Sequence, residues 1–176
     1  MSHFYQWAQR EYPLAGRIAV TGLAGLLFAV LIPLVVSVGG PRIDAALHLP
    51  NFRFGVVNYV VGVALAAVGF YFALWAIAWQ LTRGRGTPLP VMPTQTLLTQ
   101  GPFRYCRNPM SFGALTAYLG FAVAAGTIFG AVLVVCLSTL LILYLRRIEE
   151  SELVERFGEA YLSYKREVPF LIPRIR

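Results

Sequence analysis

Four long apolar runs, almost free of charge, constrain most strongly what this chain can fold into. They cover about residues 18–38, 56–81, 109–125 and 128–145, and none of them contains Asp, Glu, Lys or Arg. A predominantly apolar segment of roughly 17–25 residues is long enough to cross a bilayer as an α-helix. The sequence therefore predicts an all-α, polytopic membrane protein with about four transmembrane helices, all within one domain over residues 1–176.

Proline and glycine residues predict where these helices bend and end. Pro33 lies inside the first run, where it should kink or break the helix near its far end. Gly39-Gly40-Pro41 should then terminate that helix. The third and fourth runs are separated by Gly126-Thr127, so we expect a tight turn and a close antiparallel hairpin.

The distribution of basic residues predicts the orientation in the membrane. The formal net charge is +7, and only Arg42 and Arg53, among 15 Lys and Arg residues, lie between the first and second runs. The other 13 lie in the N-terminal segment, the 82–108 loop and the C-terminal tail. Lys and Arg accumulate on the cytoplasmic side of membrane proteins, so both termini are predicted to be cytoplasmic. The expected location is the cell membrane of a bacterium or archaeon, or the endoplasmic reticulum of a eukaryote.

The same pattern argues against several functional classes. The basic residues cluster at the ends of apolar runs and form no nucleic-acid-binding motif, so no nucleic-acid partner is expected. The runs lack the charged groups that ion-coupled transporters normally need. The two cysteines, Cys106 and Cys136, form no CxxC motif. His3 and His48 lie far in the sequence from other candidate ligands, so no metal site is expected.

A polar block precedes the third run, with the sequence GPFRYCRNPMSFG over residues 101–113. Asn108 can cap the following helix, and Pro109 fits its first position, where the missing N–H costs nothing. Arg104 and Arg107 lie beside the predicted N-terminus, whose free N–H groups favour an anion. These arginines suit either a bound anion or lipid headgroups, and the local sequence does not separate the two.

A second polar block follows the fourth run, from Glu149 to Arg176. Glu149 and Glu150 begin a segment with helical spacing, which predicts a cytoplasmic C-terminal helix. Taken alone, this pair is also compatible with a solvated helix face. The segment 168–173 contains two prolines and should be extended, either docking on the membrane surface or covering a pocket.

Together, the two blocks resemble the isoprenylcysteine carboxyl methyltransferase and phospholipid methyltransferase superfamily of integral membrane enzymes. The family pattern runs GPYRYxRHPxYxG, a helical hairpin, then EExxLxxxFGxxYxxYxxxVPxxIP. The resemblance covers about residues 97–173, in the same order and spacing, whereas the first two runs match only as hydrophobic segments. Two positions depart from the pattern: Asn108 stands where His is usual, and Ser111 stands where Tyr is usual.

The resemblance implies that S-adenosylmethionine is the cofactor and that it binds within about residues 97–173. The residues implied in cofactor binding are Tyr105, Arg107, Asn108, Pro109, Gly113, Glu149 and Glu150. Glu150 and Arg166 are the candidate catalytic residues, with Arg166 placed to meet a phosphate or carboxylate of the acceptor. Asn108 cannot titrate, so an acid–base role at that position is not expected.

The predicted function is transfer of a methyl group from S-adenosylmethionine to a lipophilic or amphiphilic acceptor. This acceptor would be an isoprenylcysteine carboxylate, a phospholipid amine or a similar group that enters from the bilayer, and the residues do not distinguish these from a thiol. The alternatives are a non-enzymatic binding or assembly protein on the same scaffold and, less favoured, a small transporter. The oligomeric state is left open.

Overall fold

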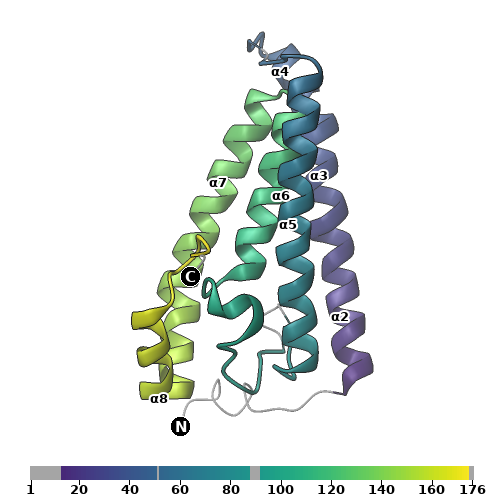
Figure 1. Ribbon diagram of the computed structural model, residues 1–176. Helices are drawn as coiled ribbons and strands as arrows, with labels where there is room; N and C mark the ends of the chain where they lie inside the picture. Colours follow the sequence, from purple (N-terminus) through teal and green to yellow (C-terminus); the bar gives the residue numbers. More distant parts are fainter. Residues whose placement is uncertain (1–12, 51, 88–91, 175–176) are drawn as a thin grey trace. The chain divides into compact units, whose positions relative to one another are not determined.

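The computed structural model describes residues 13–50, 52–87 and 92–174, and all regular secondary structure in this part is helical (Figure 1). The all-α prediction is confirmed. The α-helices are α2 (Leu14–Leu26), α3 (Ile32–Leu34), α4 (Gly40–Ala46), α5 (Val56–Thr82), α6 (Pro109–Ala125), α7 (Ile128–Tyr144) and α8 (Glu150–Glu167). A 3₁₀ turn covers Gly101–Arg104, and π-helical turns cover Leu27–Leu31, Val35–Gly39 and Leu145–Glu149.

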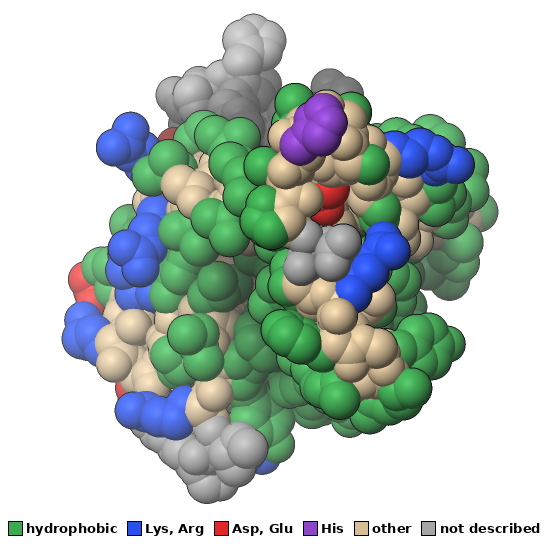
Figure 2. Space-filling view, turned by 90° about the horizontal axis from the view of Figure 1, so that it is seen from above, with side chains coloured by type: hydrophobic (Ala, Val, Ile, Leu, Met, Phe, Trp, Pro, Cys, Tyr) green, Lys and Arg blue, Asp and Glu red, His purple; other side chains and the backbone are tan. Residues whose placement is uncertain are grey.

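Three helical stretches are long and apolar enough to cross a membrane: Leu14–Ala46, Val56–Thr82 and Ile128–Glu167. The fourth predicted span, α6, is apolar but has only 17 residues. Large hydrophobic side chains such as Leu23, Val56 and Leu140 are exposed, and hydrophobic groups cover much of the face in Figure 2. Such a surface is stable only in an apolar environment. The chain is an integral membrane protein.

The first helical stretch is longer than predicted and corrects two expectations. It runs without interruption from Leu14 to Ala46, so neither Pro33 nor Gly39-Gly40-Pro41 ends it. π-Helical turns flank Pro33, and Pro41 occupies the first turn of α4, where a missing N–H is tolerated. Pro33 has no N–H to donate to the preceding turn. In the same region, the hydroxyl of Tyr118 donates to the Phe28 carbonyl (2.9 Å).

The described residues form two compact units, and α2, α5 and α6 each contribute residues to both. The hairpin unit contains residues 25–71 and 113–144, with a core of Val36, Tyr118, Ala122 and Val134. Within it, α5 and α6 approach closely at small residues. A Cβ added at Gly62 would lie 2.6 Å from the Gly120 carbonyl oxygen, which leaves no room for a side chain.

The predicted tight turn between α6 and α7 is confirmed. Gly126 has a positive φ of 62°, and the side chain of the fully buried Thr127 accepts the N–H of Gly130 as an N-cap (3.1 Å). The Asp44 carboxylate accepts two further N–H groups at the start of α7, from Ile128 (3.1 Å) and Phe129 (2.8 Å). A residue of α4 therefore helps to fix the start of α7.

The motif unit contains the described part of residues 1–24, together with 72–112 and 145–174. In this unit α8 reverses direction at Gly158, where φ is 53° and ψ is −131°. Lys165 and Glu150 are joined by an ion pair of 2.6 Å, although 15 residues of straight helix would separate them by about 22 Å. The backbone conformation at Gly158 is essentially restricted to glycine, so this residue makes the reversal possible.

We expect Gly62→Ala to destabilise the hairpin unit by about 1–3 kcal/mol, because the new methyl group would meet backbone atoms of α6. Gly25→Ala is the matched control, since an added Cβ there meets nothing within 4 Å. Thermal unfolding in detergent would compare the two variants with the parent. Equal midpoints for both variants would contradict the close approach of α5 and α6.

We expect Gly158→Ala to destabilise the motif unit by about 1–3 kcal/mol, through backbone strain alone. An added Cβ meets no atom within 4 Å, so steric overlap does not contribute. Gly22→Ala is the control in the same unit, since an added Cβ at that position also meets no atom within 4 Å. Thermal unfolding is again the measurement, and an unchanged midpoint for Gly158→Ala would contradict the glycine-specific reversal.

Candidate functional site

The candidate site lies in the motif unit, whose core joins the two polar blocks to the end of α5. Ala76, Phe103, Tyr161 and Tyr164 form the buried centre of this core. Tyr164 lies in the part of α8 that follows the reversal at Gly158, and its hydroxyl donates to the Phe103 carbonyl in the first block (2.6 Å). The segments that carry the two motifs are therefore packed together.

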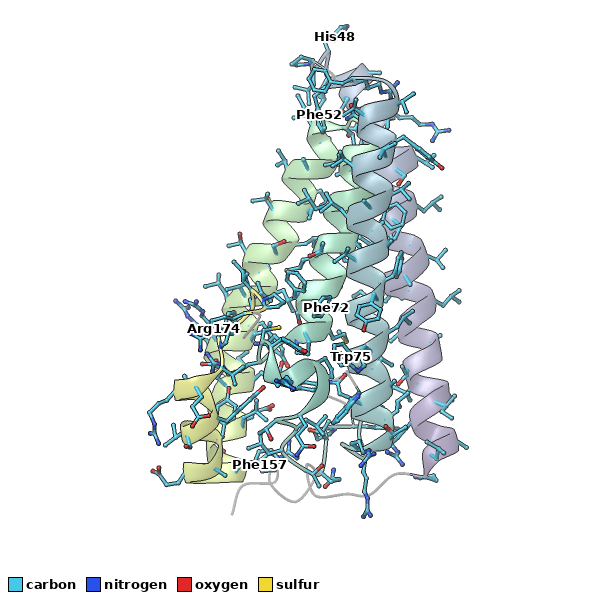
Figure 3. The ribbon with its side chains drawn as sticks, in the orientation of Figure 1. His48, Phe52, Phe72, Trp75, Phe157 and Arg174 are labelled. Atoms are coloured by element: carbon cyan, nitrogen blue, oxygen red, sulfur yellow. The ribbon has the colours of Figure 1, made fainter. Side chains whose placement is uncertain are left out.

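Aromatic contacts hold the first block against α5. Phe72 meets Phe112 edge-to-face with ring centroids 5.2 Å apart, and Trp75 meets Tyr105 in a tilted arrangement at 6.0 Å. Phe72 and Trp75 are labelled on α5 in Figure 3. Edge-to-face pairs of this kind add to the stabilisation from burial alone. The aromatic end of α5 contributes these rings to the packing of the motif unit.

The extended C-terminal segment is tied to the first block. The N–H of Arg107 donates to the Pro169 carbonyl (2.9 Å), and the Asn108 amide donates to the Phe170 carbonyl (2.9 Å). The guanidinium groups of Arg146 and Arg107 lie over the Phe170 ring, at 4.7 Å and 5.6 Å from its centroid. Asn108 therefore links the start of α6 to the tail.

A buried ion pair connects the two blocks. The Arg107 guanidinium contacts one carboxylate oxygen of Glu150, and Lys165 contacts the other (2.6 Å). The side chains of Arg107 and Glu150 are each only 10% exposed. Arg107 also donates to the Tyr161 hydroxyl (3.3 Å), while its Nε is buried without a hydrogen-bond partner in the described residues.

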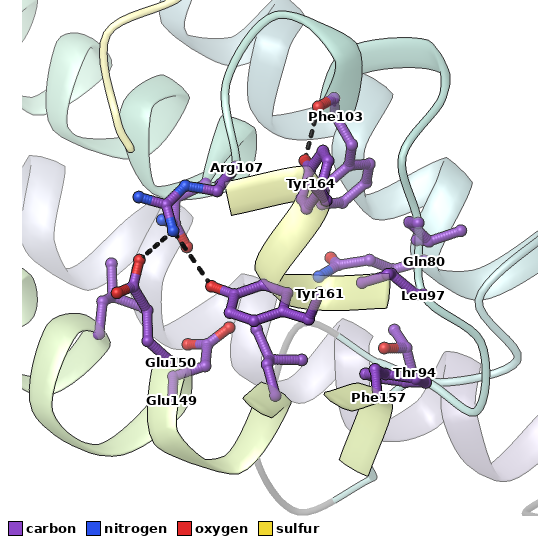
Figure 4. A pocket seen from close by; sticks show the side chains of 14 residues that line it. Gln80, Thr94, Leu97, Phe103, Arg107, Glu149, Glu150, Phe157, Tyr161 and Tyr164 are labelled. Carbon is purple, nitrogen blue, oxygen red and sulfur yellow. Dashed lines mark hydrogen bonds and ion pairs between the residues drawn. The ribbon is translucent and has the colours of Figure 1, made fainter. Parts of the chain in front are cut away.

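These groups border one pocket, which contains about 520 Å³ of empty space, part of it open to solvent (Figure 4). The pocket is lined by Gln80, Thr94, Leu97, Leu98, Phe103, Arg107, Asn108, Leu145, Glu149, Glu150, Leu153, Phe157, Tyr161 and Tyr164.

Glu149 differs from Glu150 because its carboxyl group makes no hydrogen bond or ion pair within the part of the chain that the structure describes. Burial, together with the nearby negative charges of Glu152 and Glu150, raises its pKa to about 7. Burial and the nearby Glu150 also raise the pKa of Tyr161, to about 12, so its hydroxyl keeps its proton at neutral pH. The pocket thus offers the unpaired carboxyl group of Glu149 beside the protonated phenol of Tyr161.

Of the predicted site residues, Arg107, Asn108, Glu149 and Glu150 line this pocket. Their assembly brings together residues from both blocks, as the sequence predicts. A cofactor role for these residues stays a prediction.

The other predicted site residues do not line the pocket. Tyr105 packs on Trp75, Pro109 is buried at the start of α6, and Arg166 is exposed on α8. Gly113 belongs to the hairpin unit, where its carbonyl oxygen lies close to Gly69 of α5. Their proposed roles in binding or catalysis also stay predictions.

Gln80 is a pocket residue that the sequence reasoning missed. It lies near the end of α5, and its amide oxygen is buried without a hydrogen-bond partner among the described residues. The available signal was a single polar amide near the end of an otherwise apolar run. That signal does not single out Gln80, because a polar residue near the end of a span is also expected on structural grounds.

Neither a metal nor a reactive thiol is indicated at this site. In residues 13–50, 52–87 and 92–174, no group of three or more His, Cys, Asp or Glu residues could hold a metal ion. Cys106 is fully buried, and burial raises the pKa of its thiol to about 12. Because the thiolate is the reactive form, this cysteine is inert at neutral pH.

Comparison with known proteins connects this site to a family. The model of the phospholipid methyltransferase family matches residues 57–160. Methanethiol S-methyltransferase 2 of Bradyrhizobium diazoefficiens is 31% identical over 98% of this chain, and the chain spans 65% of the length of that protein. Methanethiol S-methyltransferase of Pseudomonas deceptionensis is 36% identical over 42% of this chain and 27% of its own length.

No solved structure gives a significant match. The family match covers more than half of the chain and includes the first block, α6, α7 and most of α8. The chain belongs to the phospholipid methyltransferase family.

Proposed function

We propose that this chain is a membrane methyltransferase that binds S-adenosylmethionine in the pocket of the motif unit. The observation that carries this proposal is the pairing of Arg107 with Glu150 in a pocket that also holds the unpaired Glu149. A purely structural ion pair would not require a second, partly buried carboxyl group beside it. Family membership favours this enzyme over the binding or assembly protein and the small transporter.

The residues present fit the chemistry of this donor, which carries a carboxylate, an ammonium group, a ribose diol and a sulfonium. The Nε of Arg107 is a buried donor that still lacks an acceptor, and a ligand carboxylate can supply one. Glu149 can accept hydrogen bonds from the ammonium group or the diol. The ring of Tyr161 suits a cation through its π face.

S-Adenosylmethionine, when bound, supplies an electrophilic methyl group on a sulfonium. The protein's own contribution is positioning: Glu150 holds Arg107, and Gly158 allows Tyr161 to return to the same pocket. Leu97, Leu153 and Phe157 line the pocket with apolar surface that excludes water. Methyl transfer depends more on alignment than on a strong acid or base, which suits a site where Asn108 cannot titrate.

For the acceptor, we propose a small thiol in preference to a lipid. Two relatives bear the name methanethiol S-methyltransferase, and one of them aligns with almost the whole of this chain. In the proposed reaction the acceptor sulfur forms a bond to the methyl carbon, while the bond from that carbon to the sulfonium sulfur breaks. The thiol proton passes to water, and the donor leaves as a neutral thioether.

We also propose that α6 completes a fourth crossing, which leaves both termini in the cytoplasm. Its 17 residues are apolar throughout and stand at the lower limit of roughly 17 for a span. Four crossings place 13 of the 15 basic residues on the cytoplasmic side. The pocket would then be supplied with its donor from the cytoplasm, and an apolar acceptor could enter from the bilayer.

The function is tested with purified protein in lipid nanodiscs and S-adenosylmethionine labelled at its methyl group. We expect labelled dimethyl sulfide when methanethiol is the acceptor. Phosphatidylethanolamine in the disc and a prenylcysteine added separately are the competing acceptors, and labelling of either in place of methanethiol would overturn the thiol assignment.

Glu150→Ala should weaken donor binding about 100-fold by releasing Arg107. Glu159→Ala, at an exposed position, is the control, and equal binding by both variants would contradict the site.

The pKa of Glu149 predicts how donor binding depends on pH. The carboxyl group is mostly neutral below its pKa of about 7 and charged above it, and only the charged form attracts an ammonium group. Affinity for S-adenosylmethionine should therefore increase about tenfold between pH 6 and pH 8. Calorimetric titration across this range would measure it. Glu149→Gln should bind weakly and without this pH dependence, and a pH profile identical to that of the parent would exclude the assigned role.

A further inference from the structure

We infer that Gln80 and the apolar wall beside it form the subsite for the purine ring of the donor, with the Gln80 carboxamide recognising the amino group of adenine. The inference rests on the proposed function and adds a specificity-determining residue to it. Gln80 lies in the last turns of α5, outside both polar blocks.

The first observation is an unsatisfied hydrogen-bonding group. The Gln80 side-chain oxygen is buried and has no hydrogen-bond partner in the part of the chain that the structure describes. A buried polar atom without a partner costs free energy, so native structures rarely keep one that nothing satisfies. Because Gln80 lines the pocket, a bound molecule can satisfy its oxygen.

The second observation is the chemical difference between the two sides of the pocket. In Figure 4, Arg107, Glu149 and Glu150 lie on one side, whereas Gln80 and Leu97 lie on the other. The apolar side also includes Leu98, Leu153 and Phe157, all partly buried. The pocket therefore offers charges to one part of a ligand, and apolar surface with a single amide to another.

A purine base matches the second side. Its flat faces are apolar and stack on aromatic and aliphatic side chains, while its edge carries hydrogen-bonding groups. A glutamine carboxamide pairs with adenine through two hydrogen bonds, accepting from the exocyclic amino group and donating to a neighbouring ring nitrogen. An alkanethiol acceptor offers only a weak S–H donor and no strong acceptor, so it leaves the Gln80 carboxamide largely unsatisfied.

The test compares two ligands in the parent and in Gln80→Leu. The ligands are S-adenosylhomocysteine and its analogue without the 6-amino group, which carries purine in place of adenine. Calorimetry in detergent gives the dissociation constants. In the parent, removing the amino group should weaken binding about tenfold or more. Gln80→Leu should bind S-adenosylhomocysteine at least about tenfold more weakly than the parent and should bind both ligands equally.

Gln100→Leu makes the same chemical change at an exposed position outside the pocket and should discriminate between the ligands as the parent does. If Gln80→Leu fails to fold, Gln80→Met keeps the length of the side chain without its amide and carries the same expectation. A Gln80 variant that still discriminates overturns the purine subsite and leaves the proposed function intact. A parent that binds neither ligand overturns the proposed function, and the subsite with it.

Discussion

The buried ion pair between Arg107 and Glu150 is the contact on which the arrangement of the site depends. Its two residues are 43 positions apart: Arg107 lies just before α6, and Glu150 is the first residue of α8. Removing such charges from water is costly, and the loss of one partner leaves the other uncompensated. Lys165 and Tyr161 add further contacts to the pair, and both reach it only because α8 reverses at Gly158.

The same arrangement explains how a pocket with few reactive groups can support chemistry. Glu150 is occupied by two cations, and the raised pKa of Tyr161 keeps its hydroxyl protonated. Glu149 is the acidic residue of the pocket that remains unpaired in the described structure. A site of this composition selects and aligns its ligands, which is what an in-line methyl transfer requires.

Much of the helical framework is predictable because it depends on local sequence. Apolar runs free of charge must form helices to satisfy their backbone groups in lipid, and the bounds of α6 match the prediction. Gly126 and Thr127 form the predicted turn by local conformation and capping. The first helix was predicted too short, because Pro33 and Gly40-Pro41 are breakers only when neighbouring turns cannot adjust.

The sequence by itself determined the membrane class, the two polar blocks and the family resemblance, because each of these depends on short-range patterns. It also predicted that Arg107, Asn108, Glu149 and Glu150 would share a site. Only the tertiary structure decided that Arg107 is engaged by Glu150, that Glu149 is unpaired, and that Gln80 completes the pocket. These features depend on contacts between distant segments, which no local pattern encodes.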